Sequence, residues 1–369
     1  MGLYDAMMAK GSETSKLNLH SLSGNEMGQM DMTSWSKQQT GFGYLRICRT
    51  DLMDVFLETA SKAGVPIHFN KRLTRIEEKN DKVTAFFSDG TSDTADFLLG
   101  CDGIHSAVRK LHVDPDCTPQ YSGISNVFSL IPTSELPPAA SSLDALNATL
   151  TTDGMLVVSP ATAARDMVYW FFSREITIPT TGDTRDGWEE RGKREVDNLK
   201  TTLINLLGDA NAPWVNMLRD VVRKTDVVKF YPICKIPPGR PWSKGRCLII
   251  GDAAHAMPPH ASQGVSMALE DVFLFSNLMT HHSRNLGTHN SQSLGDLLQS
   301  YENKRKARTD QMLKNAERNG DVRKKKTPLR LWANELAISW GLRIYGMVGL
   351  DKMGIGQGPL AYDVEEEQF

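Results

Sequence analysis

The sequence of 369 residues lacks several features, and each absence excludes a class of protein. No run of about 18 apolar residues free of charge occurs, so we expect no membrane-spanning helix. Only five cysteines are present, an odd number without a C-x-x-C pair or a metal-ligand spacing to the nine histidines. We therefore expect reduced thiols, a cytoplasmic protein and no metal site. An excess of charge is also missing, because 42 basic residues face 44 acidic ones, which argues against nucleic acid as the main partner.

The most informative segment runs from Cys247 to Val272 and reads CLIIGDAAHAMPPHASQGVSMALEDV. It begins with an apolar run of strand length, continues with Gly251-Asp252, and becomes helical in pattern near Gln263. In α/β proteins an acid at the carboxyl end of a strand, close to a helix N-terminus, holds a sugar hydroxyl beside an anionic group. We therefore expect Asp252 to accept hydrogen bonds from a polyol. For the Gly-Asp pair alone, an ordinary strand-to-helix turn is the alternative.

A second strand end carries a related motif about 150 residues earlier in the chain. The run ADFLLGCDGIHSAVR places Asp102 and Gly103 directly after apolar residues, with Ser106 and Arg109 at short spacing beyond them. An Asp-Gly pair by itself indicates only a turn. The whole run predicts a strand that ends in a functional loop and continues into a helix.

A third, shorter segment opens an expected helix at Arg49. Thr50 has a side chain suited to cap this helix, Leu52 and Val55 begin its apolar face, and Gly64 is placed to end it. On its own, Arg49 is equally consistent with a surface arginine.

Together the three segments resemble the class A FAD-dependent monooxygenases, the salicylate hydroxylase-like aromatic hydroxylases, which carry D-G-x-x-S-x-V-R and then G-D-A-A-H with P-x-x-G-Q-G. The resemblance implies FAD as the cofactor, NAD(P)H as a transient reductant and a small-molecule substrate. One departure is Ser262, where the family commonly has glycine, because serine adopts positive φ less readily. The residues that the resemblance implies in FAD binding are Arg49, Asp102, Gly103, Arg109, Gly251, Asp252, Pro259, Gln263, Gly264 and Val265.

The segment that should precede Arg49 in this family is missing from the sequence. Family members begin with a strand, G-x-G-x-x-G and a helix that bind the ADP part of the cofactor. Residues 1–48 hold Gly41-Phe42-Gly43 but no such fingerprint, and they are polar and rich in methionine. We therefore expect a family member that lacks the N-terminal βαβ unit, either because the gene model starts late or because the protein is truncated.

The expected architecture is an α/β protein, with an incomplete FAD-binding nucleotide fold, an inserted α+β substrate domain and C-terminal helices. We expect strands at Pro66–Asn70, Leu73–Ile76 and Val83–Phe87, and then alternating strands from Val127 to Phe172. The expected domains are residues 1–117 as the first part of the FAD-binding domain, 118–232 as the substrate-binding insertion, 233–320 as the second part of the FAD-binding domain, and 321–369 as a helical segment and tail.

The C-terminal segment Leu329–Leu350 is the most apolar helical pattern in the chain. Arg330, Glu335 and Arg343 interrupt it, while Trp332 and Trp340 fall at helical spacing. We predict a helix that packs on the protein in preference to one that lies on a membrane surface. Membrane association is therefore not expected.

The leading functional hypothesis is a monooxygenase that hydroxylates or epoxidises an aromatic or polyketide-like molecule with NAD(P)H and O2. The alternatives are a non-catalytic remnant or truncated form of such a flavoprotein, and a flavin-dependent halogenase, which is disfavoured because the motif G-W-x-W-x-I-P is absent. Tyr231 and His260 are candidates for the rim of a substrate cavity, and Trp170, Phe171 and Phe172 are expected in the core. The sequence identifies no catalytic base and leaves the oligomeric state open.

Overall fold

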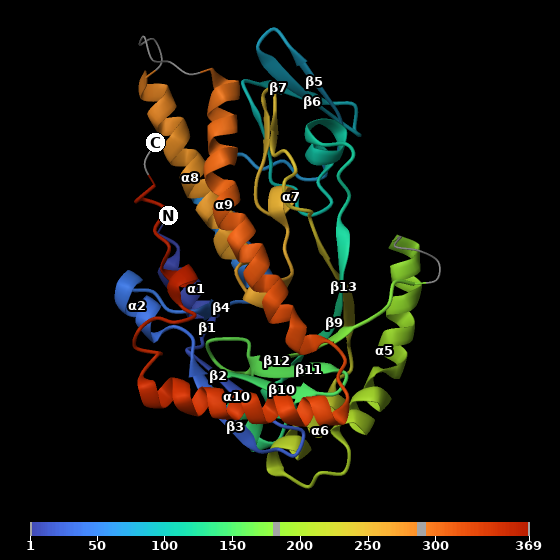
Figure 1. Ribbon diagram of the computed structural model, residues 1–369. Helices are drawn as coiled ribbons and strands as arrows, with labels where there is room; N and C mark the ends of the chain where they lie inside the picture. Colours follow the sequence, from blue (N-terminus) through green and yellow to red (C-terminus); the bar gives the residue numbers. More distant parts are fainter. Residues whose placement is uncertain (1, 180–184, 286–292, 368–369) are drawn as a thin grey trace. The chain divides into compact units, whose positions relative to one another are not determined.

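The structure is a computed structural model that describes residues 2–179, 185–285 and 293–367. The chain forms two compact units (Figure 1). Unit 1 comprises Met1–Pro66, Gly123–Pro232 and Val322–Tyr362, and unit 2 comprises Ile67–Ser122, Ile233–Asp321 and Asp363–Phe369. Each unit has its own sheet and its own buried core, and the two are described in turn.

Unit 1 is built on a seven-stranded sheet whose strand order is β13-β9-β12-β11-β10-β2-β3. Within this order β9, β12, β11 and β10 pair antiparallel with their neighbours, whereas β2 pairs with β10 in parallel. The strands are β2 (Lys16–His20), β3 (Glu26–Asp31), β9 (Gln120–Pro132), β10 (Leu146–Thr151), β11 (Gly154–Pro160), β12 (Met167–Glu175) and β13 (Lys229–Lys235).

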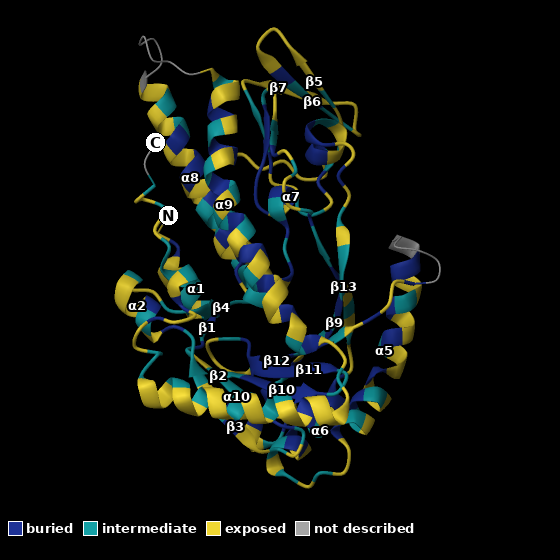
Figure 2. Cartoon of the chain, viewed as in Figure 1, coloured by how far each residue is buried: buried dark blue, intermediate teal, exposed yellow. Residues whose placement is uncertain are grey.

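The core of unit 1 lies between this sheet and two helices, α5 (Arg185–Leu207) and α6 (Pro213–Lys224). Alternate residues of β12 face this core, and Trp170 and Phe172 are fully buried there. Figure 2 shows strand β11 of the same sheet in dark blue, the colour of buried residues. The indole N–H of Trp170 donates to Thr225 Oγ1 at 2.9 Å, so this large side chain is buried with its polar atom satisfied. The prediction of a core position is confirmed for Trp170 and Phe172, whereas Phe171 between them is only half-buried.

The first 66 residues belong to unit 1, which differs from the expected boundary at residue 117. The reason is strand pairing, because β2 aligns Leu17 with Leu146 and continues the sheet of unit 1. Met27 on β3 is buried in a cluster with residues of β10 and β11. The polar, Met-rich appearance of this segment hid two strands that form through this tertiary pairing. The remaining elements here are α1 (Tyr4–Lys10), β1 (Ser12–Glu13), α2 (Ser34–Thr40), β4 (Leu45–Arg46) and α3 (Arg49–Lys62).

Helix α10 (Pro328–Val348) also packs on unit 1, as predicted for this segment. Thr327 caps its first turn, Leu331 is buried with Met27, and Ser339 Oγ donates to Met27 O at 3.1 Å. The helix also carries exposed apolar side chains, including that of Trp340. Figure 2 shows much of α10 in yellow, the colour of exposed residues. No helix within the described residues has the length and apolar character that crossing a membrane requires.

Unit 2 contains two small sheets and a pair of long helices. In one sheet β14 (Ser243–Lys244), β15 (Cys247–Ile249) and β8 (Leu98–Gly100) lie side by side, and β15 runs parallel to β8. The other is the antiparallel set β5 (Leu73–Lys79), β6 (Lys82–Phe87) and β7 (Ser92–Ala95). Helices α7 (Asp252–His255), α8 (Gly264–Asn285) and α9 (Leu294–Gly320) complete the unit. The strand expected at Pro66–Asn70 does not form, and these residues are exposed.

The packing of α10 on β3 can be tested at Gly28. This glycine has φ +151°, and an added Cβ would lie 2.9 Å from Leu342 Cδ1, so alanine would push the helix off the strand. We expect Gly28→Ala to lower the free energy of unfolding by about 1–3 kcal/mol. Gly341→Ala on the same helix is the control, because its Cβ meets nothing within 4 Å. We expect that variant to be neutral or slightly stabilised. Urea unfolding followed by circular dichroism measures both, and equal stabilities would contradict this packing.

Candidate active site in unit 2

The two acid-containing motifs meet at one edge of a parallel sheet. Strands β8 and β15 are aligned so that Gly100 lies opposite Ile249, and Ile250 N donates to Gly100 O at 3.0 Å. The carboxyl ends of parallel neighbours point the same way, so the loops that hold Asp102 and Asp252 emerge side by side. Two motifs that lie about 150 residues apart in the sequence are therefore neighbours in the structure.

Asp252 is the acid of this site that is free to bind a ligand. Its side chain is exposed at the start of α7, and no hydrogen bond to its carboxylate occurs within the described ranges. Gly251 before it adopts φ +59°, a conformation that glycine reaches without strain. An exposed carboxylate is compatible with an acceptor for a sugar hydroxyl, and both that role and the alternative of a simple turn stay predictions.

The loop that carries Asp252 is held from behind by a buried carboxylate, Asp271 of α8. Its Oδ2 accepts from Gly251 N and from His255 Nε2, both at 2.7 Å, and its Oδ1 accepts from Arg305 Nε at 2.6 Å. Burial by itself raises the pKa of Asp271, but the charges and hydrogen bonds of His255 and Arg305 outweigh burial and hold that pKa below its usual value. Asp271 is therefore a charged anchor of the loop.

Arg305 of α9 is the cation that balances this anchor. It is almost fully buried, and besides Asp271 it pairs with Glu270 at 2.7 Å and donates to Met267 O at 3.0 Å. Arg308 also pairs with Glu270, at 3.0 Å. The acidic pair of α8 and the arginines of α9 thus join the two helices and fix the position of the α7 loop. The sequence analysis assigned no role to this network.

The Asp102 carboxylate is used within its own loop. Its oxygens accept from Ser106 Oγ at 2.5 Å, from Ala107 N at 2.6 Å and from Val108 N at 3.1 Å. These bonds satisfy backbone donors at a helix start, as a capping residue does. Gly103, the next residue, has φ +78° and forms the turn. A direct contact between Asp102 and a cofactor stays a prediction.

Arg109 connects the two motifs. It is buried, its Nη1 donates to Ala253 O at 2.5 Å, and its Nη2 donates to Ile104 O. Burial lowers the pKa of this guanidinium. Because its donors are directed at backbone carbonyls of both loops, Arg109 positions one loop against the other. Its predicted contact with FAD is not tested by this geometry.

The remaining predicted residues of the first segment, Cys247–Val272, surround the start of α8. Ser262 adopts φ +54°, a left-handed conformation that costs serine more than the glycine common in the family. Gln263 is buried. Gly264 and Val265 are exposed in the first turn, and Pro259 is exposed in the short turn before it. The N-terminus of a 22-residue helix, with its free N–H groups, therefore opens to the surface of unit 2.

Arg49 lies in unit 1, exposed in the first turn of α3. The helix begins there, but Cys48 occupies the cap position and Thr50 does not cap it, so that prediction was wrong. Gly64 follows the last turn with φ +69°, as expected.

Unit 1 also shows a group of aromatic side chains around Tyr169, a residue that the sequence did not single out. Tyr169 of β12 lies beside Phe128 and Phe171, with ring centroids 6.0 and 5.7 Å away. The guanidinium of Arg46 sits 5.6 Å from the centroid of the Tyr169 ring. Burial raises the pKa of Tyr169. Side chains alternate between the two faces of a strand, so the burial of Trp170 places Tyr169 on the opposite face. This periodicity is the signal by which the sequence could have indicated Tyr169.

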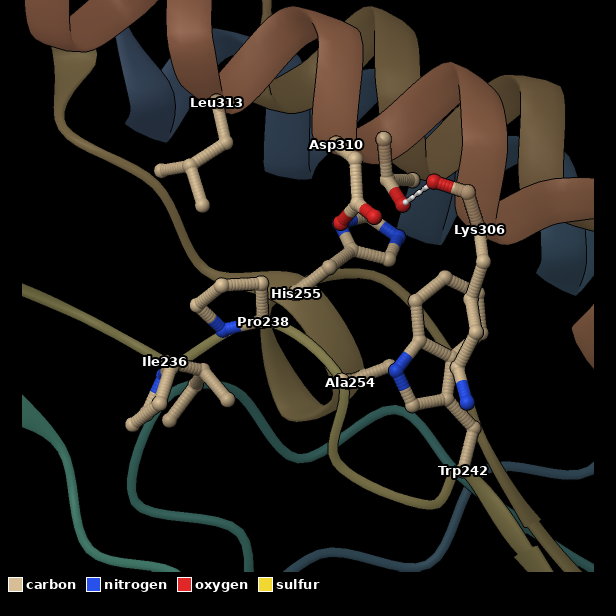
Figure 3. A pocket seen from close by; sticks show the side chains of 11 residues that line it. Ile236, Pro238, Trp242, Ala254, His255, Lys306, Asp310 and Leu313 are labelled. Carbon is tan, nitrogen blue, oxygen red and sulfur yellow. Dashed lines mark hydrogen bonds between the residues drawn. The ribbon is translucent and has the colours of Figure 1, made fainter.

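A small pocket lies beside the buried network of unit 2 (Figure 3). His255 and Ala254 reach it from α7, and Lys306 and Asp310 reach it from α9. His255 Nδ1 is buried there without a hydrogen-bond partner among the described residues. The remaining lining residues are Ile236, Pro237, Pro238, Gly239, Trp242, Thr309 and Leu313. The two rim candidates lie elsewhere: Tyr231 is exposed on β13, and the backbone carbonyl of His260 accepts from Asn319.

The sequence as a whole matches one protein family. The family described as FAD binding domain matches residues 1–226 and 235–316, and the chain belongs to it. The resemblance to salicylate hydroxylase-like FAD-dependent monooxygenases is thereby confirmed, and FAD is the cofactor of the family.

Individual relatives agree with this assignment. The 6-hydroxynicotinate 3-monooxygenase of Bordetella bronchiseptica is 29% identical over 256 residues, which cover 69% of this chain and 62% of that protein. The chain thus spans less than two thirds of the length of this relative. The salicylate hydroxylase of Pseudomonas putida is 25% identical over 80% of this chain and 67% of its own length.

Solved structures show the same fold. HpxO of Klebsiella pneumoniae, crystallised with FAD and uric acid, has a TM-score of 0.74 at 23% identity and covers 96% of this chain and 84% of its own. A salicylate hydroxylase substrate complex has a TM-score of 0.67 at 19% identity, over 99% of this chain and 84% of that one. The expected α/β class with an FAD-binding fold is confirmed.

The anchoring role of Asp271 predicts a large effect on stability. Asp271→Ala leaves Arg305 buried without its main partner, which typically costs about 3–5 kcal/mol. Asp252→Ala, an exposed acid in the same loop, is the control, and we expect its stability to change by no more than about 0.5 kcal/mol. Urea unfolding of both variants measures the difference. Equal stabilities would show that the network does not hold the fold.

The charge of Asp271 also predicts a pH dependence. Its pKa is lower in the folded than in the unfolded protein, so its contribution to stability is full above about pH 4 and is lost as the pH falls through the folded pKa. Asp271→Asn keeps the shape but removes this titration. We therefore expect the free energy of unfolding to fall less steeply below pH 4 in the Asn variant than in the wild type. Parallel slopes would contradict an ionised Asp271.

Proposed function

We propose that the protein is an FAD-dependent monooxygenase that uses NAD(P)H and O2 to hydroxylate or epoxidise an aromatic or polyketide-like small molecule. The observation that carries the proposal is the convergence of two flavin-family motifs at the ends of neighbouring parallel strands, with the Asp252 carboxylate unpartnered and exposed. Membership of the FAD binding domain family and the names of the relatives support it.

The residues of unit 2 fit a flavin cofactor in two respects. A free carboxylate at a strand end suits the hydroxyls of a ribityl chain, because each hydroxyl needs an acceptor. The open N-terminus of α8, at Gly264 and Val265, suits an anionic group, because its N–H groups and the helix dipole favour negative charge. Asp252 and the first turn of α8 would therefore hold the cofactor, and Gly251 would let the backbone approach it.

The chemistry that bound FAD supplies is activation of O2 after reduction by NAD(P)H. The protein's own residues bind, orient and stabilise charge. The first turn of α8 would stabilise negative charge on a bound flavin through its N–H groups. Asp271 keeps the Gly251 loop in place through its bonds to Gly251 N and His255, and Arg109 holds the Asp102 loop against Ala253. Two of these bonds are buried and the bond to His255 is partly buried, so the loops are held in place before a ligand enters.

The substrate side of the proposal rests on unit 1. Tyr169, Phe128 and Phe171 form a row of half-buried rings on one face of the sheet, and Arg46 adds a cation. Planar rings stack on such a surface, and a carboxylate would pair with the guanidinium. The relatives include a 6-hydroxynicotinate 3-monooxygenase and a salicylate hydroxylase, and the names of both contain an aromatic acid. We propose that Arg46 and Tyr169 contact the substrate.

Two rivals remain for the same fold. A non-catalytic remnant would keep the strand ends but bind FAD weakly, because each lost charge-assisted hydrogen bond removes about 1.5–3 kcal/mol. A flavin-dependent halogenase would use the same cofactor and yield a chlorinated product. The cytoplasmic location, the domain limits by function and the choice between NADH and NADPH stay predictions.

The activity can be tested on the 369-residue protein. FAD and NADH or NADPH are supplied with salicylate, 6-hydroxynicotinate and larger phenolic polyketides. We expect bound flavin in the visible spectrum, substrate-stimulated oxidation of the nicotinamide and a product heavier by one oxygen atom. Absence of FAD binding would favour the remnant. Binding without an oxygenated product from any substrate would reject the proposed reaction, and a chlorinated product would establish the halogenase.

The role of Asp252 can be tested separately. If its carboxylate accepts a hydroxyl of the cofactor, Asp252→Ala should weaken FAD by about 1–3 kcal/mol, a tenfold to hundredfold loss. Asp252→Asn should be milder, because its amide oxygen still accepts one bond. Flavin titration by fluorescence quenching, with circular dichroism as the control for folding, measures both. Unchanged affinity in the alanine variant would show that this acid belongs only to a turn.

A further inference from the structure

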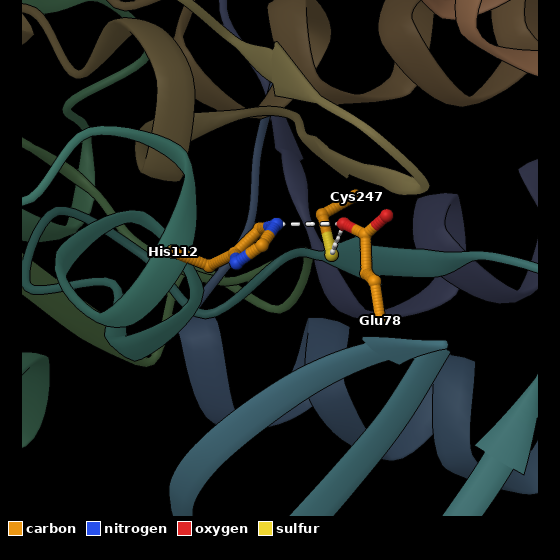
Figure 4. Close-up of side chains that lie close together, drawn as sticks. All are labelled: Glu78, His112 and Cys247. Atoms are coloured by element: carbon orange, nitrogen blue, oxygen red, sulfur yellow. Dashed lines mark hydrogen bonds and ion pairs between the residues drawn. The ribbon is translucent and has the colours of Figure 1, made fainter. Parts of the chain in front are cut away.

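We propose that unit 2 binds a divalent transition metal ion of the zinc class through Glu78, His112 and Cys247. The three side chains come from separate segments: the end of β5, the π-helical turn Arg109–Val113, and the first residue of β15. Figure 4 shows them directed toward one another, and their ligand atoms all lie within 4.8 Å of each other. The cluster lies at the opposite end of β15 from Asp252, because Cys247 is the first residue of that strand and Asp252 follows its last one.

The geometry is close to that of a tetrahedral metal site. His112 Nε2 lies 2.7 Å from Glu78 Oε1, and Cys247 Sγ lies 3.8 Å from the same oxygen. Zinc ligands at about 2.0–2.3 Å from the ion lie roughly 3.3–3.8 Å from one another in a tetrahedron. An ion would therefore replace the bond between His112 and Glu78 after these two side chains move apart by about half an ångström.

The surroundings hold the three ligands in place. The second carboxylate oxygen of Glu78 accepts from Arg246 N at 3.1 Å, which orients the carboxylate. Gly245 has φ +57°, and a Cβ at this position would collide with that carboxylate, so the turn accommodates Glu78 closely. The backbone carbonyl of His112 accepts from Lys244 Nζ at 3.1 Å, which anchors the π-helical turn.

The donor set indicates which ion the site would take. Thiolate and imidazole ligands favour zinc over magnesium or calcium, which prefer sites built from oxygen alone. Cys247 is fully buried, whereas the side chains of His112 and Glu78 are 17% and 25% exposed. Three protein ligands and an accessible fourth position allow water to complete the coordination. Binding releases the thiol proton of Cys247 to solvent, so a thiolate, a neutral imidazole and a carboxylate balance the charge of the ion.

The alternative is that His112 and Glu78 form an ordinary ion pair next to a buried thiol. The ammonium group of Lys244 near the site favours that alternative, because it adds a positive charge. The two possibilities differ in one respect that can be measured. In a metal site Cys247 and His112 bind the same ion, whereas in the ion pair Cys247 binds no ion.

The experiment uses the full chain, purified under reducing conditions, treated with EDTA and titrated with Co²⁺ as a spectroscopic substitute for zinc. We expect one Co²⁺ per chain, a thiolate-to-cobalt charge-transfer band in the near ultraviolet, its loss on addition of Zn²⁺, and a higher thermal midpoint with either ion. No band at stoichiometric Co²⁺ would overturn the proposal.

Variants assign the ligands. We expect Cys247→Ser and His112→Gln each to abolish the band and the thermal shift, and Glu78→Gln to weaken Co²⁺ binding at least tenfold. Cys101→Ser is the matched control, because Cys101 is an exposed thiol outside the cluster, and we expect it to leave both signals unchanged. Circular dichroism shows which variants are folded. A band that survives in folded Cys247→Ser or His112→Gln, or that disappears in Cys101→Ser, would contradict the assignment.

Discussion

The buried carboxylate of Asp271 is the interaction on which the candidate site depends. It joins Gly251 N, His255 and Arg305, which come from the end of β15, from α7 and from α9. A buried charge of this kind is tolerated only when its partners satisfy it, and each bond therefore restricts where those elements can lie. Since Arg305 also bonds to α8, the two long helices and the strand end form one rigid support.

The support explains how a site can be presented without side chains that are themselves strained or mobile. Asp271 bonds to Gly251 N and to the side chains of His255 and Arg305, and Arg109 donates to backbone carbonyls of both loops. Asp252 and the first turn of α8 are exposed. Acids of the same motif thus have opposite roles: one is buried and paired, and the other is free. This division suits a protein that binds a large cofactor, because preorganised loops lose little entropy when the ligand arrives.

Unit 1 shows a comparable division on its sheet. Trp170 and Phe172 fill the core against α5 and α6, while Tyr169 on the opposite face keeps a half-buried ring beside Arg46. The pleat of a strand produces this alternation, so one strand supplies core residues on one face and the proposed substrate contact on the other. The proposed metal cluster arises in another way. It consists of Glu78, His112 and Cys247, which the fold brings together although their spacing in the chain is not that of a metal-binding motif.

The sequence by itself determined the family, the α/β class, the two strand-end motifs and the start of the helix at Arg49, because each depends on residues close together in the chain. The positive φ of Ser262 was also foreseeable from a glycine position in the family motif. Tertiary structure decided the rest. The strands β2 and β3 exist through pairing with β10 and burial of Met27, the cap of α3 is Cys48 instead of Thr50, and Arg109 is turned inward to join two loops. The pairing of β2 and the orientation of Arg109 depend on partners more than a hundred residues away, and local pattern carries no information about them.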